Sequence, residues 1–569
     1  MSPRKKLGLL VIPWILVVAF SAASPGQLEK IYWGSEVPAG WSGDWPVEFQ
    51  TVPEKTNFQK TTPHHEILEF INGLLWKSEN LHVFNMYTSE LRNVCPLVIM
   101  ANPRVTSPED AKASGKPVVY LQANIHPSEP SGKEALLILM RDILLGDKKH
   151  LLNNQVILVV PSLNVDGNDA WSLTASTTLP GLLGTRTNAL GYDLNRDAIK
   201  LETPAVRELY RNVFNRWDPV LVYCSHHMGG QKYAYPIVYC TSNVPTAHPG
   251  PRGYVHETLF PAVRSAVREK WGVETFFHAG TNHSEAWPPT IWTFDLSAWT
   301  VEGKFIVSGY GLRNRMSILV ESAWHNTFEK HIYSQYAYAS ELLEYTNTHG
   351  KEMMKVCFDA DQDTVNKVMA KAESGQLKNW VEGKYESRGK VDLFMYPEVE
   401  YEYIPGTSIR RIKPAALEKG PVVIRGIEDI TKPVGIKEAT FPRGYLIPAK
   451  FKDIVEKLRI HNINVHVLEK SVKVSGEEFV VDNLKKVQKR GYEMTELEGG
   501  FLKSTKEFPA GTYQVDLAQP LANMAFYCLE PEVGDGFVGW GLFDDYLISI
   551  GVRERSVVYP VFKYLKIVE

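Results

Sequence analysis

A histidine and a glutamate three residues apart are the first candidates for chemistry in this chain. His126 and Glu129 follow residues 117–124, an apolar run with the length of a buried strand. In a turn or a first helical turn, this spacing lets both side chains face the same way, so an imidazole and a carboxylate can share one metal ion. The pair taken alone is more typical of a turn capped by the glutamate.

A second apolar run also ends in histidines. Residues 220–225 precede His226 and His227. The carboxyl ends of the strands in an open α/β sheet form one ligand crevice, so His226 is expected to reach His126 and Glu129. Adjacent strand residues face opposite sides, so His227 is an alternative ligand, and both histidines also fit simple packing at a strand end. Two imidazoles and one carboxylate would leave a fourth zinc position open, as catalytic sites do.

Glu321 ends a third apolar run, residues 316–320. A carboxylate there is costly unless it is paired or functional. A glutamate beside metal-activated water is what amide hydrolysis needs as a general base, because it takes the proton of the water and returns it to the leaving amine. Glu329 is the competing candidate, but its polar surroundings favour a solvated side chain. We therefore expect Glu321 to be the general base.

The polar segment 186–197 is dense in side chains that bind carboxylates. Asn195 and Arg196 could hold a terminal carboxylate, with the bidentate geometry that a guanidinium offers. Arg186 could stabilise a developing oxyanion, and Asp193 could orient a ligand imidazole from behind. By itself the segment also fits a polar surface loop.

The elements that must position these residues predict an α/β fold. Strands, turns and helices alternate in the rhythm of βαβ units, which favours a mixed, mostly parallel open sheet flanked by helices. We expect helices over residues 64–76 and 132–145, and strands over residues 81–87, 95–101, 117–124, 155–162, 220–225 and 316–320.

The pattern changes beyond about residue 350. Short strands and turns are expected there, for example at residues 407–409, 421–424, 464–468 and 511–516, with one helix at 448–461. This predicts a catalytic domain over residues 64–350, a linker over 351–380 and a β-rich accessory domain over 381–569. An N-terminal arm, residues 24–63, precedes the catalytic domain.

The first residues indicate export. Three basic residues, Arg4 to Lys6, precede an apolar run over residues 7–20, and small residues follow at 21–23. This run is shorter than the roughly 20 residues that span a bilayer. Residues 1–23 are therefore interpreted as a cleaved signal peptide, and the mature protein as secreted or periplasmic with no membrane anchor.

Net charge and cysteine content argue against nucleic-acid binding, a disulfide framework and a thiolate metal site. The 569 residues include 62 Lys and Arg against 65 Asp and Glu, a net charge of -3, so no basic surplus is present to bind nucleic acid. Five scattered cysteines without a CxxC pair predict neither a disulfide framework nor a thiolate metal site.

Together these motifs resemble zinc metallocarboxypeptidases of the carboxypeptidase A type, in the form of the large secreted bacterial members. The resemblance covers about residues 64–350. The family signature is a HxxE pair, an Asn-Pro-Asp-Gly-like turn, an Asp-x-Asn-Arg segment, a distant His and a later Glu. The matching positions, in order, are His126 with Glu129, residues 164–167, residues 193–196, His226 and Glu321.

The resemblance implies a role for each matched residue. One zinc ion per chain would be held by two histidines and a glutamate, Glu321 would be the general base, Asn195 and Arg196 would bind the terminal carboxylate, and Arg186 would lie near the oxyanion. The implied zinc ligands are His126, Glu129 and His226, with Asp193 behind them. The family's tyrosine is not fixed by the alignment, and Tyr310 and residues 299–313 are its candidates.

The sequence departs from the family pattern at three positions. Val165 replaces the proline of the turn, Asp197 stands where asparagine is common, and Cys224 stands where related members often carry aspartate. Asp197 is expected to place negative charge beside Asn195 and Arg196, the residues that would bind the terminal carboxylate.

The sequence thus predicts a secreted zinc peptidase that hydrolyses amide bonds near peptide C-termini, with a peptide or protein substrate. Two alternatives remain. One is a zinc amidohydrolase acting on acylated amino acids, and the other is a non-catalytic peptide- or glycan-binding protein with the same fold. The oligomeric state is not predicted.

Overall fold

In the computed structural model, Tyr32–Glu569 form one unit. The predicted signal peptide, residues 1–23, lies outside the described residues. The structure describes residues 31–34, 36–173, 179–228, 232–296, 300–323, 325–397, 401–403, 410–412, 417, 419–489 and 491–568.

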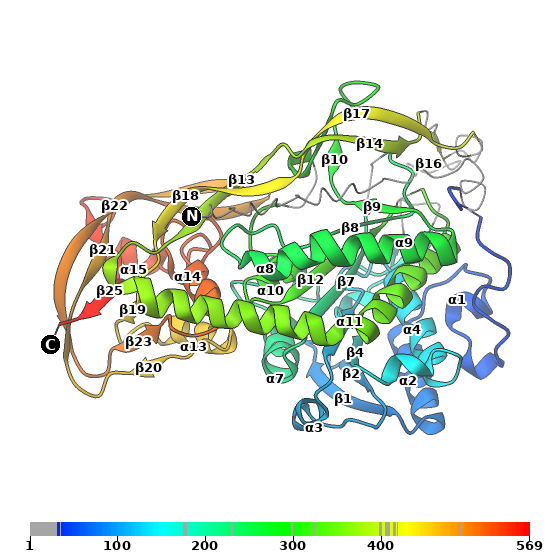
Figure 1. The fold of residues 1–569 in the computed structure, drawn as a ribbon, viewed down its shortest axis with the longest axis horizontal. Coiled ribbons are helices and arrows are strands. Elements are labelled where there is room, and N and C mark those ends of the chain that lie inside the picture. Colours follow the sequence, from blue (N-terminus) through cyan, green and yellow to red (C-terminus); the bar gives the residue numbers. More distant parts are fainter. Residues whose placement is uncertain are drawn as a thin grey trace, which may run out of the picture. The chain divides into compact units, whose positions relative to one another are not determined.

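An eight-stranded sheet forms the centre of the molecule (Figure 1), in the order β1-β2-β4-β3-β7-β12-β8-β9. The inner strands β4, β3, β7 and β12 run parallel, whereas β1, β2 and β8 join antiparallel. The mixed, mostly parallel sheet predicted from the sequence is confirmed. Its strands are β1 (Leu81–Thr88), β2 (Val94–Met100), β3 (Val118–Gln122), β4 (Val156–Val160), β7 (Leu221–His227), β8 (Ile237–Cys240), β9 (Thr275–Phe277) and β12 (Met316–Ser322).

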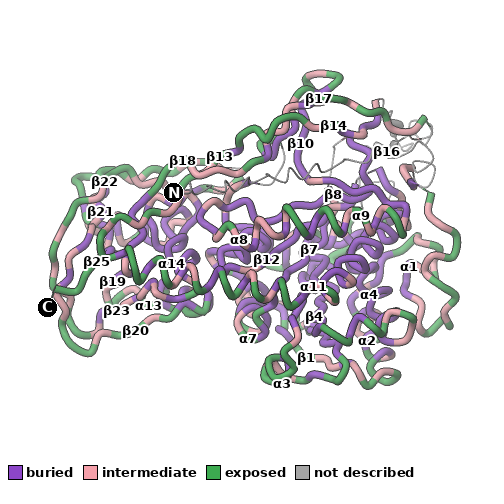
Figure 2. Tube along the Cα trace, viewed as in Figure 1, coloured by how far each residue is buried: buried purple, intermediate pink, exposed green. Residues whose placement is uncertain are grey.

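Helices cover both faces of this sheet, and alternate strand residues point into two separate cores. Leu221 and Tyr223 of β7 belong to one core, and Val222 and Cys224 to the other. Figure 2 shows the resulting buried strands in purple. The first core is closed by α2 (His64–Lys77), α4 (Ser131–Leu144), α9 (Phe260–Trp271) and α11 (Phe328–Lys371), and the second by α3 (Pro108–Ser114), α6 (Pro204–Leu209), α7 (Asn215–Trp217) and α10 (Ile306–Gly311).

The longest helix was not expected from the sequence. α11 is 44 residues long and continues to Lys371, where strands and turns had been predicted after about residue 350. Its last buried residues are separated by one, three or four positions, which is the spacing of a helix with one covered face. These residues are Met353, Cys357, Ala360, Asp361, Thr364 and Val368. The domain boundaries drawn from the sequence stay a prediction.

Beyond α11 the chain is rich in strands, as expected. A seven-stranded sheet has the path β20-β23-β19-β25-β21-β22, with β24 beside β21, and the predicted helix at 448–461 is α13. The expected strand at 407–409 lies outside the described residues. The sheet consists of β19 (Gly444–Ile447), β20 (His466–Val467), β21 (Val472–Lys489), β22 (Tyr492–Phe508), β23 (Tyr513–Asp516), β24 (Val557–Val558) and β25 (Phe562–Ile567), and the helices are α13 (Lys452–Ile460), α14 (Ala522–Leu529) and α15 (Asp544–Ser549).

Shorter elements complete the described chain. β14 and β17 form a four-stranded sheet with β10 and β11, while β13 pairs with β18, β15 with β16 and β5 with β6. The bounds are α1 (Val52–Lys55), α5 (Val165–Asn168), α8 (Pro249–Tyr254), β5 (Ser172–Leu173), β6 (Leu182–Leu183), β10 (Gly280–Thr281), β11 (Ile291–Thr293), β13 (Lys378–Glu386), β14 (Gly389–Met395), β15 (Tyr401–Tyr403), β16 (Arg410–Ile412), β17 (Val422–Ile430) and β18 (Lys432–Thr440).

The N-terminal arm is tied to α4 by buried charges. Arg141 is fully buried and donates hydrogen bonds to the carbonyl oxygens of Ser42 (2.8 Å) and Phe49 (3.1 Å) and to the carboxylate of Glu54 (2.9 Å). Because an unpaired buried charge is strongly destabilising, these contacts make the arm an integral part of the fold.

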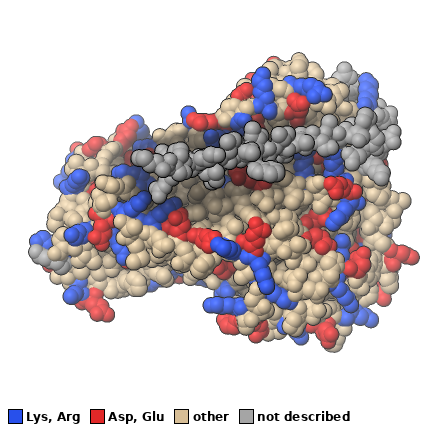
Figure 3. Space-filling view, in the orientation of Figure 1, with Lys and Arg blue, Asp and Glu red and all other residues tan. Residues whose placement is uncertain are grey.

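Three surface and covalent features bear on function. All five cysteines are free and buried in this structure. Within the described residues, no helix is both long and apolar enough to cross a membrane. Acidic and basic side chains are interspersed on the face shown in Figure 3.

Candidate metal centre

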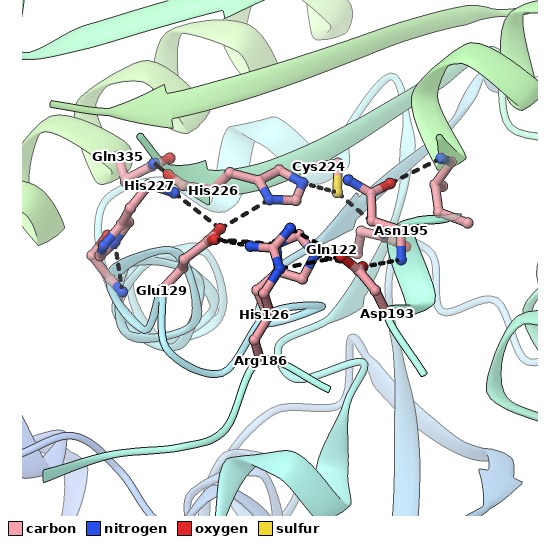
Figure 4. A network of polar contacts seen from close by, with 12 residues as sticks. Gln122, His126, Glu129, Arg186, Asp193, Asn195, Cys224, His226, His227 and Gln335 are labelled. Carbon is pink, nitrogen blue, oxygen red and sulfur yellow. Dashed lines mark hydrogen bonds and ion pairs between the residues drawn. The ribbon is translucent and has the colours of Figure 1, made fainter. Parts of the chain in front are cut away.

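Three side chains converge where β3 and β7 end. His126 follows β3, Glu129 precedes α4, and His226 lies near the end of β7. Their ligand atoms all lie within 4.8 Å of one another. The Nδ1 atoms of the histidines face the two oxygens of Glu129, at 3.1 Å for His126 and 3.0 Å for His226 (Figure 4). This is a donor set of two imidazoles and one carboxylate.

Close packing of α4 against β7 brings Glu129 to this position. A Cβ atom at Gly132 would overlap the side chain of Ser225, so only glycine allows this approach. Between β3 and α4, the backbone N–H of Glu129 donates to the carbonyl oxygen of His126 at 2.9 Å and closes the turn. The spacing of three residues thus places both side chains on one side, as the sequence pattern predicted.

Strand alternation separates His226 from His227. His226 shares its side of β7 with Cys224, whereas the ring of His227 stacks on His331 of α11 with centroids 4.5 Å apart. Nε2 of His227 accepts a hydrogen bond from the backbone N–H of Ser131 at 3.2 Å. The structure therefore brings the ring of His226, and not that of His227, to Glu129, whereas His227 donates only its backbone N–H to Glu129, at 3.2 Å.

Both candidate histidine ligands contact a second side chain through Nε2. Nε2 of His126 lies 2.9 Å from Oδ1 of Asp193. Nε2 of His226 lies 3.1 Å from Sγ of Cys224, and Gln122 donates to that sulfur at 3.1 Å. The sequence analysis missed Gln122 and Cys224 as partners of a ligand. A partial signal was available, because Cys224 precedes His226 by two positions on the same strand and so shares its side, whereas the pairing of Gln122 with Cys224 across β3 and β7 is set by the sheet.

The electrostatics of the cluster fit a bound cation. Burial lowers the pKa of both His126 and His226, but in both the nearby negative groups outweigh it and the pKa is raised. Burial opposes ionisation of Glu129, yet the two imidazoles hold its pKa well below the usual range. Nδ1 of His126 is buried and, among the described residues, has no hydrogen-bond partner of good geometry. A divalent ion among these atoms would satisfy them all.

Glu321 lies beside this cluster on β12. The parallel register of β12 and β7 pairs Glu321 with His226. Its Oε2 atom is buried without a hydrogen-bond partner in the described part of the chain. Burial, assisted by the charge of Glu129, raises the pKa of Glu321 well above its usual value, and Arg186 and Arg196 counteract part of this effect. The carboxylate is thus poised to hold a proton.

The polar segment 186–197 borders the same cluster. Arg186 donates to Glu129 at 2.9 Å and to Asp193 at 3.1 Å. Arg196 stacks over the ring of Phe305 at 4.6 Å. Oδ1 of Asn195 accepts the backbone N–H of Ile306 at 3.0 Å, which fixes the orientation of the side-chain amide. The structure therefore brings all the predicted site residues into one neighbourhood.

Two expectations about this region need correction. Asp197 does not place its charge beside Asn195, because the buried carboxylate accepts the N–H groups of Glu202 (2.6 Å) and Thr203 (2.7 Å) at the start of α6. Tyr310 is fully buried and donates to the carbonyl oxygen of Pro219, so it does not face the site.

Comparison with known proteins identifies the domain that carries this cluster. Residues 80–290 match the sequence model of the zinc carboxypeptidase family. The chain contains a zinc carboxypeptidase domain. This family consists of zinc-dependent hydrolases of peptide bonds, and the three candidate ligands lie inside the matched residues. Glu321 lies beyond the matched residues of the zinc carboxypeptidase domain.

Curated relatives extend the similarity past the zinc carboxypeptidase domain. Carboxypeptidase 2 of Trichophyton tonsurans is 24% identical over 472 residues, which cover 79% of this chain and 77% of the relative. Human carboxypeptidase D is 30% identical over 165 residues, which cover 27% of this chain and 11% of the relative.

Solved metallo-carboxypeptidases are also similar. The structure from Burkholderia cenocepacia has 16% identity and a TM-score of 0.37, covering 50% of this chain and 69% of that one. The structure from Pseudomonas aeruginosa in complex with (2-guanidinoethylmercapto)succinic acid has 18% identity and a TM-score of 0.33, covering 51% and 68%.

Proposed function

We propose that this protein is a secreted or periplasmic zinc carboxypeptidase that removes residues from the C-termini of peptides. The observation that carries the proposal is the convergence of His126, Glu129 and His226, with Glu321 paired to His226 on the next strand. The export part of the proposal rests on the apolar run at residues 7–20.

His126, Glu129 and His226 would hold one zinc ion per chain. The donation of His126 Nε2–H to Asp193 leaves Nδ1 as the metal-binding nitrogen. In His226, Nε2 likewise faces Cys224, which leaves Nδ1 to bind the metal. A bound zinc ion supplies a Lewis acid that polarises the scissile carbonyl and lowers the pKa of water.

Glu321 is placed to move the proton. Its partly buried carboxylate takes a proton from the attacking water and returns it to the nitrogen of the leaving amine. The raised pKa of Glu321 favours the protonated intermediate of this transfer. Glu321 is the acidic residue of β12, and the pairing of β12 with β7 places it opposite the candidate ligand His226.

The polar segment would bind the rest of the reacting peptide. Arg196, with the side-chain amide of Asn195, would hold the terminal carboxylate. Arg186 is 43% exposed in its side chain and lies against Glu129, from where its guanidinium can donate to the oxyanion.

A pair of matched peptides tests this function. The mature protein, with its zinc content measured by mass spectrometry, is given one peptide as a free acid and the same peptide as a C-terminal amide. We expect about one zinc per chain and release of the last residue from the free acid, with the amide at least about 100-fold slower because its charge-assisted contacts are lost.

Each other outcome points elsewhere. Equal cleavage of both peptides would contradict a carboxypeptidase. Cleavage only of acylated amino acids would support an amidohydrolase, and zinc without any hydrolysis would support a binding protein.

A further inference from the structure

The C-terminal region reaches the candidate site through a long hairpin. β21 and β22 pair from Val472 with Phe508 to Lys489 with Tyr492, where the chain turns. Gly491 in this turn has φ +84°, a conformation that favours glycine. The turn places Tyr492 at the end of the hairpin, as the first residue of the returning strand.

The end of the hairpin is anchored beside the C-terminal helices. The backbone N–H of Thr495 donates to the carbonyl oxygen of Gly539 at 2.9 Å, and its hydroxyl donates to Asp544 at 2.8 Å. Lys486 forms an ion pair with the same carboxylate at 2.5 Å. The position of Tyr492 is therefore fixed by contacts on both strands.

A row of rings and one cation leads from the hairpin to the polar segment. The ring of Tyr492 meets Trp540 edge to face, with centroids 5.7 Å apart. Nζ of Lys200 lies 4.5 Å from the centroid of Trp540 and 5.6 Å from that of Tyr192. Tyr192 directly precedes Asp193. We call Tyr492, Trp540, Lys200 and Tyr192 the aromatic row.

The phenol of Tyr492 lies in the field of the site's charges. Burial and the charge of Asp193 raise its pKa, while the guanidinium groups of Arg196 and Arg186 act in the opposite direction. Arg196 would hold the terminal carboxylate, and Arg186 would donate to the oxyanion. Tyr492 is partly exposed.

A second set of contacts joins the C-terminal region to the turn that holds Asn195. The hydroxyl of Tyr527 accepts the N–H of Gly303 at 2.7 Å, and Asp535 accepts the N–H of Lys304 at 2.8 Å. These backbone groups precede Ile306, whose N–H holds Asn195. The C-terminal region thus supports the site from two directions.

We propose that the C-terminal hairpin forms one wall of the substrate site, and that Tyr492 contacts the C-terminal side chain of the bound peptide and selects it by size. The proposal rests on the proposed function, because it assumes that Asn195 and Arg196 hold the terminal carboxylate. Trp540 supports the ring of Tyr492 from behind. A large terminal side chain gains apolar and ring contacts there, whereas a small one does not reach the wall.

Equilibrium binding separates this proposal from the proposed function. Peptides that differ only in a final Phe or Ala are titrated by calorimetry into the zinc-loaded Glu321→Gln protein, with and without Tyr492→Ala. We expect Tyr492→Ala to weaken binding of the Phe peptide about 10- to 100-fold and of the Ala peptide less than about 3-fold. Tyr492→Phe keeps the ring and should preserve the preference.

Tyr546→Ala is the matched control. Tyr546 has a similar degree of burial in the same region but packs on Phe451 and Lys450, so its removal should leave both affinities unchanged. If Glu321→Gln protein binds neither peptide, the proposed function fails. If it binds both and Tyr492→Ala weakens them equally or not at all, the assignment of Tyr492 is wrong.

A second measurement leaves the hairpin unchanged and so does not depend on the folding of a hairpin variant. A peptide ending in the photoreactive residue benzoylphenylalanine is irradiated with the Glu321→Gln protein, and the crosslinked residue is mapped by mass spectrometry. Crosslinks at Tyr492 or Trp540 support the proposal. It is overturned if every crosslink lies outside both the hairpin and residues 534–544.

Discussion

Glu321 stands directly opposite His226 in the parallel pairing of β12 and β7. Paired residues of neighbouring parallel strands direct their side chains to the same face, one strand spacing of about 4.8 Å apart. A proton-accepting carboxylate is thereby held beside a candidate metal ligand by backbone hydrogen bonds, with no contribution from a flexible loop.

Glu321→Gln should abolish hydrolysis while leaving the metal in place. Removal of a general base costs about 10²- to 10⁴-fold in rate. Steady-state release of a C-terminal residue measures this loss, and mass spectrometry should still find about one zinc per chain. Glu329→Gln is the control, since Glu329 accepts a hydrogen bond from Trp41 and should retain full activity. A Glu321→Gln protein within tenfold of the wild-type rate would contradict the assignment.

The adjacent histidines provide a matched pair for the metal site. His226→Ala removes a candidate ligand, so the zinc content should fall from about one per chain to below about 0.1 after dialysis. His227→Ala removes the stack on His331 and the acceptor for Ser131 instead, with a cost in stability of about 1–3 kcal/mol and no loss of zinc. Loss of zinc in His227→Ala alone would reverse the assignment of the ligands.

Strand ends made much of the site predictable from sequence. Apolar runs of strand length fix the direction of the chain, and a sheet gathers their carboxyl ends at one edge. His126, His226 and Glu321 each end such a run, so their convergence follows from local patterns. The choice between His226 and His227 depends on which side of β7 faces the crevice, and only the pairing with neighbouring strands decides it.

The remaining features depend on contacts between distant segments. Tyr492 approaches Asp193 only because a hairpin about 300 residues later in the chain is anchored against Trp540. Asp197 turns away from Asn195 because the start of α6 supplies two N–H donors. The second half of α11 was missed because its buried residues are widely spaced among polar ones, which weakens the apolar pattern.

Tyr527→Phe should weaken substrate binding more than it slows catalysis. The change removes the acceptor for Gly303 N–H and the donor to Asp535, and so loosens the turn that holds Asn195. We expect KM for free-acid peptides to rise about 3- to 10-fold with kcat within about 2-fold. Tyr559→Phe is the control, because that buried hydroxyl donates to Leu529 within the C-terminal region, so KM should not change. Equal effects of both changes would show a general loss of stability.

The buried pair of Glu530 and Lys563 should make stability depend on pH. Their charged atoms lie 2.9 Å apart, and Tyr445 donates to the same carboxylate at 3.1 Å. Burial raises the pKa of Glu530 to about 7, although Lys563 acts to lower it. Because the folded pKa exceeds the unfolded one, this group contributes most to stability below the unfolded pKa, and the contribution is lost as the pH rises toward 7.

Lys563→Met removes the cation that stabilises the ionised form of Glu530. At pH 8 the variant retains an unpaired buried carboxylate and should lose about 3–5 kcal/mol of unfolding free energy. At pH 5 Glu530 is protonated in the folded state, so the loss should be within about 1 kcal/mol. Urea unfolding at the two pH values, each relative to the wild type, measures the difference. The double variant Glu530→Gln with Lys563→Met should show no such difference between the two pH values, because neither side chain then titrates. An equal loss of stability at both pH values in Lys563→Met alone would show that packing of Lys563 against Phe501 dominates.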